Sequence, residues 1–134
     1  METDAARDAI LGIWTLISYQ DRESQQERWV HTFGDNPGGL ALYHSSGTLA
    51  MQVFPDTSSA SPVHEMHVAY LGRFNVREAR QKGDRFSGVL EHHIERASYP
   101  DLLAEDVARP FELWGNELVL GDGRTWVRRF QRVL

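Results

Sequence analysis

The fold of this 134-residue chain is decided by one segment, Phe33-Gly34-Asp35-Asn36-Pro37-Gly38-Gly39-Leu40-Ala41-Leu42-Tyr43-His44-Ser45-Ser46-Gly47-Thr48-Leu49-Ala50-Met51-Gln52-Val53. Turn-forming residues are dense from Gly34 to Gly39. Two short apolar runs follow, Leu40 to His44 and Thr48 to Phe54, and neither carries helix caps. Ser45-Ser46-Gly47 fits a three-residue hairpin loop in which the glycine takes the left-handed position of a bulge. The segment therefore predicts a β-hairpin.

The length of that loop sets the register of the hairpin. With three loop residues, His44 pairs with Thr48 and Tyr43 pairs with Leu49. The residues that then share one face are Ala41, Tyr43, Leu49, Met51 and Val53. A two-residue loop would shift the register by one and pair Tyr43 with Thr48. We favour the first register because it gathers the larger apolar set on one face.

The rest of the chain has the pattern of short strands separated by turns. A short helix is expected over residues 5–11, ending at Gly12. Further strands are expected over residues 12–20, 27–33, 69–76, 85–97, 107–114, 117–120 and 124–133. The intervening segments are a loop at 55–62, a helical turn at 63–68, a charged turn at 77–84 and a connection at 98–106. About nine strands and almost no helix predict an all-β fold, a closed antiparallel β-barrel of about eight to nine strands with a short N-terminal helix. Periodicity alone does not separate this barrel from a β-sandwich.

Composition narrows the class of protein. A chain of 134 residues is expected to form a single domain, residues 1–134, with a core that needs no disulfide or metal. It has no cysteine and a formal net charge of −5 without a dominant basic patch, so we expect neither thiol chemistry nor a nucleic-acid partner. No apolar run reaches membrane-spanning length, and the polar start at Met1 to Asp8 is unlike a signal peptide. We therefore expect no membrane insertion and a cytoplasmic location, and leave the oligomeric state open, a homodimer included.

Several short motifs occur along the chain in a defined order. They are Gly12-Ile13-Trp14, Pro37-Gly38-Gly39-Leu40 with Tyr43, Tyr70-Leu71-Gly72-Arg73-Phe74, His92-His93-Ile94-Glu95 before Pro100, Arg109-x-Phe111-x-Leu113, Gly115-Asn116-Glu117-Leu118-Val119-Leu120, and Phe130-x-Arg132-Val133. No single motif is specific, but their order and spacing from Leu11 to Val133 resemble the lipocalin-like domain family of bacteria and fungi. Pro110 and Leu102-Leu103-Ala104 depart from the family pattern, so we expect the entrance of the barrel to differ from that of its relatives.

The resemblance implies a closed barrel with a small-molecule pocket, without defining any chemistry in it. It also implies that Trp14 and Arg132 stack at one end of the barrel. That contact is a planar cation over an indole ring, and its role is structural.

Two polar residues stand out in otherwise apolar strands, His92 and Arg109. Symmetric pairing about the 98–106 connection predicts Ile94 near Arg109 and His92 near Phe111, which makes His92 and Arg109 diagonal neighbours on one face. Facing the interior, they could bind a carboxylate or an enolate, the arginine as a charged fork and the histidine as a tunable proton donor. The alternative is structural: the arginine bonded to backbone carbonyls and the histidine filling a gap in the core. The full set of predicted ligand-binding residues is Tyr43, Met51, Tyr70, Phe74, His92, Arg109, Phe111 and Trp126.

Other catalytic and metal patterns are weak. His64-x-x-His67 lies in an expected loop, and the rings of His92 and His93 point to opposite faces of a strand, so we expect no metal site and no cofactor. Ser18 and Ser45 have no histidine and aspartate at a spacing that indicates a hydrolase triad. Gly121-Asp122-Gly123 precedes an expected strand and not a helix, so it is no phosphate loop.

Three functions follow from these patterns. The first is a barrel that binds a small, largely apolar molecule bearing an acidic or carbonyl group. The second is an isomerase or cyclase acting on a polyketide- or terpenoid-like substrate, with His92 moving a proton. The third is a protein-interaction barrel with a filled core, which the volume of the pocket separates from the other two.

Overall fold

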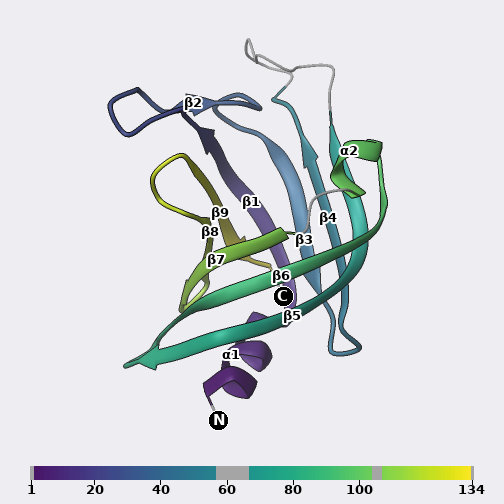
Figure 1. The fold of residues 1–134 in the computed structure, drawn as a ribbon, viewed down its shortest axis with the longest axis vertical. Coiled ribbons are helices and arrows are strands. Elements are labelled where there is room, and N and C mark those ends of the chain that lie inside the picture. Colours follow the sequence, from purple (N-terminus) through teal and green to yellow (C-terminus); the bar gives the residue numbers. More distant parts are fainter. Residues whose placement is uncertain (1, 57–66, 104–106, 134) are drawn as a thin grey trace.

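The computed structural model describes residues 2–56, 67–103 and 107–133. Its elements are α1 (Glu2–Ile10), β1 (Gly12–Asp21), β2 (Val30–His31), β3 (Gly38–Tyr43), β4 (Thr48–Phe54), β5 (Val68–Lys82), β6 (Arg85–Ala97), α2 (Pro100–Leu103), β7 (Val107–Trp114), β8 (Glu117–Gly121) and β9 (Trp126–Arg132), shown in Figure 1. Among the described residues, no helix is long and apolar enough to cross a membrane.

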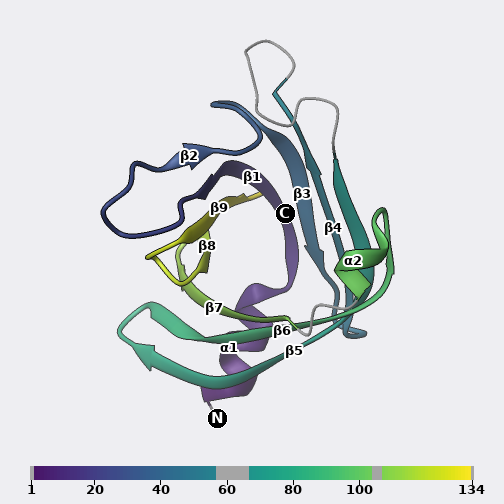
Figure 2. The same cartoon turned by 45° about the horizontal axis from the view of Figure 1, so that its top comes forward.

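The strands form a closed antiparallel barrel because β1 has partners on both edges. Its first residues, Gly12 to Thr15, pair with β3, and the stretch from Trp14 to Asp21 pairs with β9. The remaining strands follow one another as antiparallel neighbours from β3 to β9, so eight strands close the ring, and the short β2 adds to the end of β1. Figure 2 shows the strands curving around a central space, with α1 below one end. The predicted all-β closed barrel with a short N-terminal helix is confirmed.

The β3–β4 hairpin has the register predicted from the three-residue loop. Tyr43 pairs with Leu49, and the amide of His44 donates to the carbonyl of Thr48 over 2.9 Å. Gly47 takes a φ of 90°, which a side chain would disfavour. The predicted apolar face is buried: Ala41, Tyr43, Leu49, Met51 and Val53 are each at most 5% exposed.

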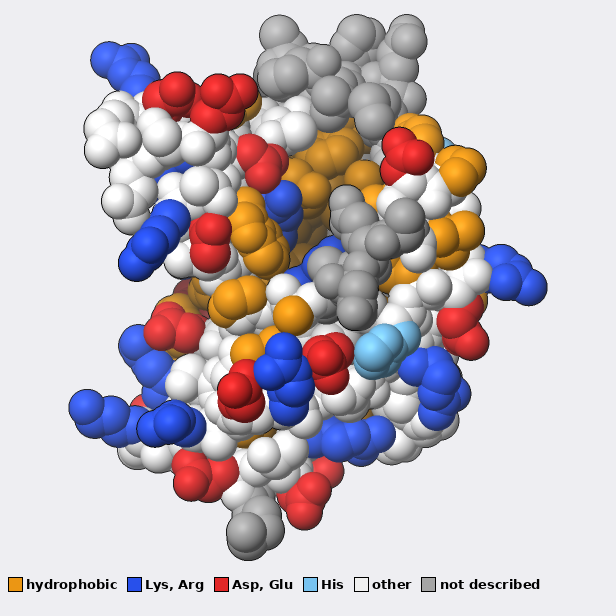
Figure 3. Space-filling view, in the orientation of Figure 1, with side chains coloured by type: hydrophobic (Ala, Val, Ile, Leu, Met, Phe, Trp, Pro, Cys, Tyr) orange, Lys and Arg blue, Asp and Glu red, His pale blue; other side chains and the backbone are white. Residues whose placement is uncertain are grey.

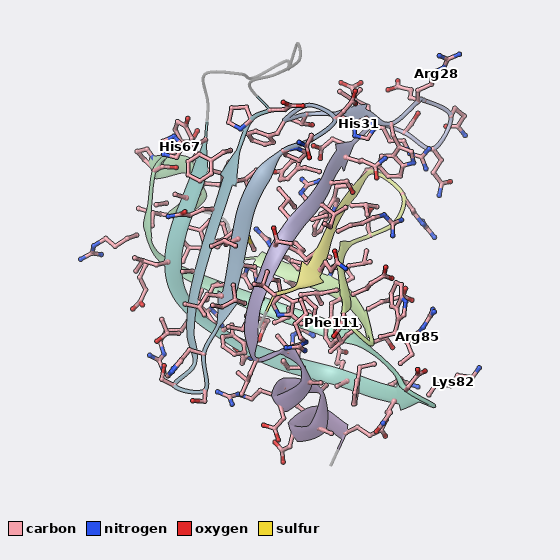
Figure 4. The ribbon with its side chains drawn as sticks, turned by 180° about the vertical axis from the view of Figure 1, so that it is seen from behind. Arg28, His31, His67, Lys82, Arg85 and Phe111 are labelled. Atoms are coloured by element: carbon pink, nitrogen blue, oxygen red, sulfur yellow. The ribbon has the colours of Figure 1, made fainter. Side chains whose placement is uncertain are left out.

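The β5–β6 hairpin is longer than predicted. Residues 77–82, expected in a charged turn, continue β5 past a second register shift between Arg77 and Arg80. Their charged side chains do not show the alternation of a half-buried strand, because this part of the hairpin lies beyond the barrel core. There the backbone amide of Gln81 donates to the Glu2 carboxylate of α1. In Figure 4, Lys82 and Arg85 mark the protruding tip of this hairpin.

Two other predicted elements differ. The strand expected over residues 27–33 is reduced to Val30–His31, which pair with Asp21 and Gln20 of β1. The helix expected from residue 5 begins at Glu2 and ends at Ile10. The helical turn expected over residues 63–68 lies almost wholly outside the described residues, and Val68 opens β5.

One end of the barrel is closed by α1 and held by Trp14 and Arg132. Trp14 is fully buried and donates from Nε1 to the carbonyl of Ile10 over 2.8 Å. The Arg132 guanidinium lies 4.2 Å from the centroid of the Trp14 ring, and it donates to the carbonyls of Leu11 and Ala9. These carbonyls belong to the C-terminal end of α1, where backbone acceptors lack partners within the helix. The stacked pair therefore anchors the helix beneath the barrel.

Candidate functional site

A cavity of about 830 Å³ opens near Tyr19 and Asp21 at the end of β1, whereas α1 precedes the start of that strand. Its walls come from β1, β2, β4, β5, α2 and β7 to β9, and from the loops that follow β1, β2 and β8. The lining residues are Tyr19, Asp21, Arg22, Glu23, Glu27, Val30, Thr32, Met51, Val53, Val68, Tyr70, Leu102, Arg109, Leu120, Thr125, Trp126, Arg128 and Phe130. Figure 3 shows a hollow with hydrophobic walls and basic side chains inside it. Cavities of this size with mainly apolar walls are typical of small-molecule sites.

Arg109 is a half-buried cation in this cavity. It donates from Nη2 to the hydroxyl of Tyr70 over 3.4 Å, and its guanidinium lies 5.9 Å from the centroid of the Trp126 ring. Within the described part of the chain it forms no ion pair with a carboxylate. Because a guanidinium carries five donors and does not lose its charge, the described protein groups leave most of its hydrogen-bonding capacity to other acceptors in the cavity.

Arg128 is a second cation of the cavity, and the sequence patterns missed it. Its guanidinium lies 3.4 Å from the centroid of the Tyr19 ring and 5.1 Å from that of Trp126, and it pairs with Asp21 at 3.0 Å. It also donates to the carbonyl of Gln20. The signal for its inward position was the alternation of β9, in which Phe130, two residues on, is buried. Unlike Arg109, Arg128 is already neutralised by a carboxylate.

His92 lies behind the cavity wall, between two tyrosine hydroxyls. The ring is fully buried; Nε2 is 2.9 Å from the Tyr43 hydroxyl, and Nδ1 is 2.9 Å from the Tyr70 hydroxyl. Burial, together with the nearby charge of Arg109 and the neighbouring His93, holds the pKa of His92 well below its usual value. The imidazole is therefore neutral.

Pairing of β6 with β7 brings His92 and Arg109 to one face, but in a different register from the predicted one. Arg109 pairs with Leu90, where Ile94 was the predicted partner. His92 pairs with Val107, where Phe111 was the predicted partner. The predicted register is wrong because α2 occupies the connection, so the two strands do not meet symmetrically about its centre. The shift is an even number of residues, so Arg109 is still a diagonal neighbour of His92.

The eight residues predicted to bind ligand fall into two groups. Met51, Tyr70, Arg109 and Trp126 line the cavity, whereas Tyr43, Phe74, His92 and Phe111 do not. The second group is buried deeper in the barrel, with the rings of Tyr43 and Phe74 in edge-to-face contact at 5.0 Å. In Figure 4, Phe111 lies farther down the barrel than His31 and His67.

The histidines considered as metal ligands are dispersed. His67 is exposed and stacks on Phe54, with 5.7 Å between the ring centroids. His93 is exposed on the outer face of β6 and contacts Asn75 over 3.0 Å, whereas His92 is inside. His64 lies outside the described residues. No group of three potential metal-binding side chains occurs in the described ranges.

Comparison with known proteins identifies a family for this chain. The family model for the lipocalin-like domain matches residues 11–129. No curated protein and no solved structure matches the chain.

Proposed function

Because this chain belongs to the lipocalin-like domain family, we propose that it binds a small, largely apolar molecule bearing an acidic or carbonyl group inside its barrel. A barrel of eight strands has room for one small ligand. The cavity of about 830 Å³ favours this function over a protein-interaction barrel with a filled core. Mainly apolar walls would supply most of the binding energy through burial of the ligand's hydrocarbon surface.

The observation that carries the proposal is Arg109, a cation in a cavity with mainly apolar walls, without a carboxylate partner among the described residues. A half-buried guanidinium is stabilised by an acceptor that can take its N–H groups. An acidic or carbonyl oxygen on the ligand is such an acceptor, while the apolar remainder of the ligand would contact Met51, Val53 and Phe130. Tyr70 and Trp126, beside Arg109, would complete the binding site.

Binding of a fluorescent fatty acid, 11-(dansylamino)undecanoic acid, tests this proposal. We expect the wild-type chain to bind it with an increase and blue shift of fluorescence. Arg109→Met keeps the apolar stem but removes the charge, so the acid should bind about 1.5–3 kcal/mol more weakly, the usual worth of a charged hydrogen bond. The methyl ester of the probe, which carries no negative charge, should lose much less.

Arg96→Met is the matched control, because Arg96 is exposed on β6 and donates to the carbonyl of Glu95, outside the cavity lining. It should bind the acid as the wild type does. Val53→Trp, which fills the cavity, should weaken both acid and ester. Binding of the acid that survives Val53→Trp and Arg109→Met alike would contradict a site inside the barrel.

The isomerase or cyclase remains the alternative on the same barrel. His92 does not line the cavity, so a proton from it would reach a substrate only through the Tyr70 hydroxyl. Turnover abolished by His92→Phe, with ligand binding retained, would favour the enzyme over a carrier. The cytoplasmic location expected from the sequence also remains a prediction, and fractionation of cells that produce the tagged chain would test it.

A further inference from the structure

The two tyrosines and His92 form a hydrogen-bonded chain that runs from the core to the cavity. Tyr43, from β3, contacts Nε2 of His92, and Tyr70, from β5, contacts Nδ1. Tyr70 also lines the cavity and accepts a hydrogen bond from Arg109. A neutral imidazole has one N–H donor and one acceptor nitrogen, so the protons in this chain have two arrangements.

In the first arrangement, His92 carries its proton on Nε2. That N–H donates to the oxygen of Tyr43, and the hydroxyl of Tyr70 donates to Nδ1. The hydroxyl proton of Tyr43 then lacks an acceptor, because His92 is the only hydrogen-bond partner of Tyr43 in the described part of the chain, and Tyr43 is 1% exposed. A buried donor without a partner is costly.

In the second arrangement, His92 carries its proton on Nδ1. The hydroxyl of Tyr43 donates to Nε2, and Nδ1–H donates to the oxygen of Tyr70. Every buried donor of Tyr43 and His92 then has an acceptor. The hydroxyl proton of Tyr70 is the remaining one, and it is free to point into the cavity that Tyr70 lines. The second arrangement is therefore the stable one.

This arrangement directs two donors to one place in the cavity. The Tyr70 oxygen and Arg109 Nη2 are 3.4 Å apart, so a single ligand oxygen can lie within hydrogen-bond distance of both. The aromatic rings of Trp126 and Tyr19 are part of the same lining, which suits a flat, conjugated ligand. Burial raises the pKa of Tyr70, and the nearby Arg109 only partly offsets this effect, so Tyr70 keeps its proton as a donor.

We propose that the Tyr70 hydroxyl and the Arg109 guanidinium form an oxyanion site, which binds a phenol- or enol-type ligand as its anion and lowers the ligand's pKa. Tyr43 and His92 are positioning residues, because they orient the Tyr70 hydroxyl without touching the ligand. Donors held in place by the protein do not have to reorient when a negative oxygen binds, so they stabilise it more than water does. This inference rests on the proposed function, since it needs a ligand inside the barrel.

A pair of coumarins separates the inference from the proposed function. 7-Hydroxycoumarin is a flat weak acid whose neutral and anionic forms absorb at different wavelengths, and 7-methoxycoumarin cannot ionise. Both should bind the wild-type barrel. Spectra of bound 7-hydroxycoumarin recorded across a pH series should show its ionisation shifted down by about one pKa unit, equivalent to about tenfold tighter binding of the anion than of the neutral form.

Variants assign that shift to the two donors. Tyr70→Phe and Arg109→Met should each remove most of the shift, because each should weaken the binding of the 7-hydroxycoumarin anion more than the binding of 7-methoxycoumarin. Arg109→Met also serves as an independent test if Tyr70→Phe does not fold. Tyr99→Phe is the matched control for the loss of a tyrosine hydroxyl, because Tyr99 does not line the cavity, and it should keep the full shift.

The tautomer itself can be observed by ¹⁵N NMR of the histidine side chains. We expect the Nδ1–H form for His92 in the wild type, and loss of that preference in Tyr43→Phe together with a smaller shift of the coumarin. A wild-type Nε2–H form, or binding of 7-hydroxycoumarin without a downward shift, would overturn the inference and leave the proposed function standing. If neither coumarin binds while the dansyl acid does, the inference is overturned and the proposed function stands; if none of the three probes binds, both are contradicted.

Discussion

Acidification should destabilise this protein through His92. The unfolded chain binds a proton on this histidine below its ordinary pKa of about 6.5. The folded chain does not, because the ring is fully buried between the hydroxyls of Tyr43 and Tyr70, and Arg109 and His93 add positive charge nearby. Below about pH 6.5 the unfolded state therefore binds more protons, so stability falls as the pH falls.

The size of the effect follows from the lowered pKa. If His92 remains neutral in the folded state down to pH 5, protonation of the unfolded state between pH 7 and pH 5 costs about 1.9 kcal/mol of unfolding free energy. Other groups also titrate in this range, so the quantity to measure is the difference between the wild type and a variant that lacks this histidine. His92→Gln keeps a hydrogen-bonding side chain but does not titrate.

Urea denaturation at pH 7 and pH 5 measures this difference. His92→Gln should be less stable than the wild type at pH 7, but it should lose about 2 kcal/mol less on going to pH 5. His67→Gln is the control, because His67 is exposed and is not among the groups that lower the pKa of His92, so this variant should keep the wild-type pH dependence. Equal losses in the wild type and in His92→Gln would refute the reasoning that the buried ring stays neutral.

Two further predictions concern the ends of the barrel. Trp14→Ala should lower the unfolding free energy by about 3–5 kcal/mol, because the ring is fully buried and its Nε1 holds the carbonyl of Ile10; a loss below about 1 kcal/mol in urea denaturation would refute this role. At the β8–β9 turn, burial alone would raise the pKa of Asp122. The carboxylate accepts hydrogen bonds from the amides of Thr125, Arg124 and Trp126 and from the Thr125 hydroxyl. These hydrogen bonds outweigh the effect of burial and hold the pKa of Asp122 well below its usual value. The ionised carboxylate therefore stabilises the fold above about pH 4, and this stabilisation is lost as the pH falls. The difference in unfolding free energy between the wild type and Asp122→Asn should accordingly shrink between pH 6 and pH 3. A constant difference would contradict this role of the Asp122 carboxylate.

Local patterns predicted the hairpins well where one face of a strand is buried. The register of β3 and β4 followed from the loop at residues 45–47, because a shift by one residue would have exposed the apolar face. The bounds of β6 and β7 also agree with the alternation of their side chains. The far end of β5 was missed because its charged residues pair with β6 beyond the core, where neither face is buried enough to leave an apolar pattern.

The sequence by itself determined the class of fold, the central hairpin and its register, and the residue types able to hold a small molecule, since turn chemistry and side-chain alternation are local properties. Only the tertiary structure decided which of these residues meet. Tyr43, Tyr70, His92 and Arg109 lie on β3, β5, β6 and β7, and closure of the barrel together with the register of β6 on β7 brings them into one hydrogen-bonded chain. In the closed barrel His92 lies behind the cavity wall, and Arg128 lies against Tyr19 and Trp126. The sequence does not give this arrangement, because the depth of a side chain in a barrel depends on strands that are distant along the chain.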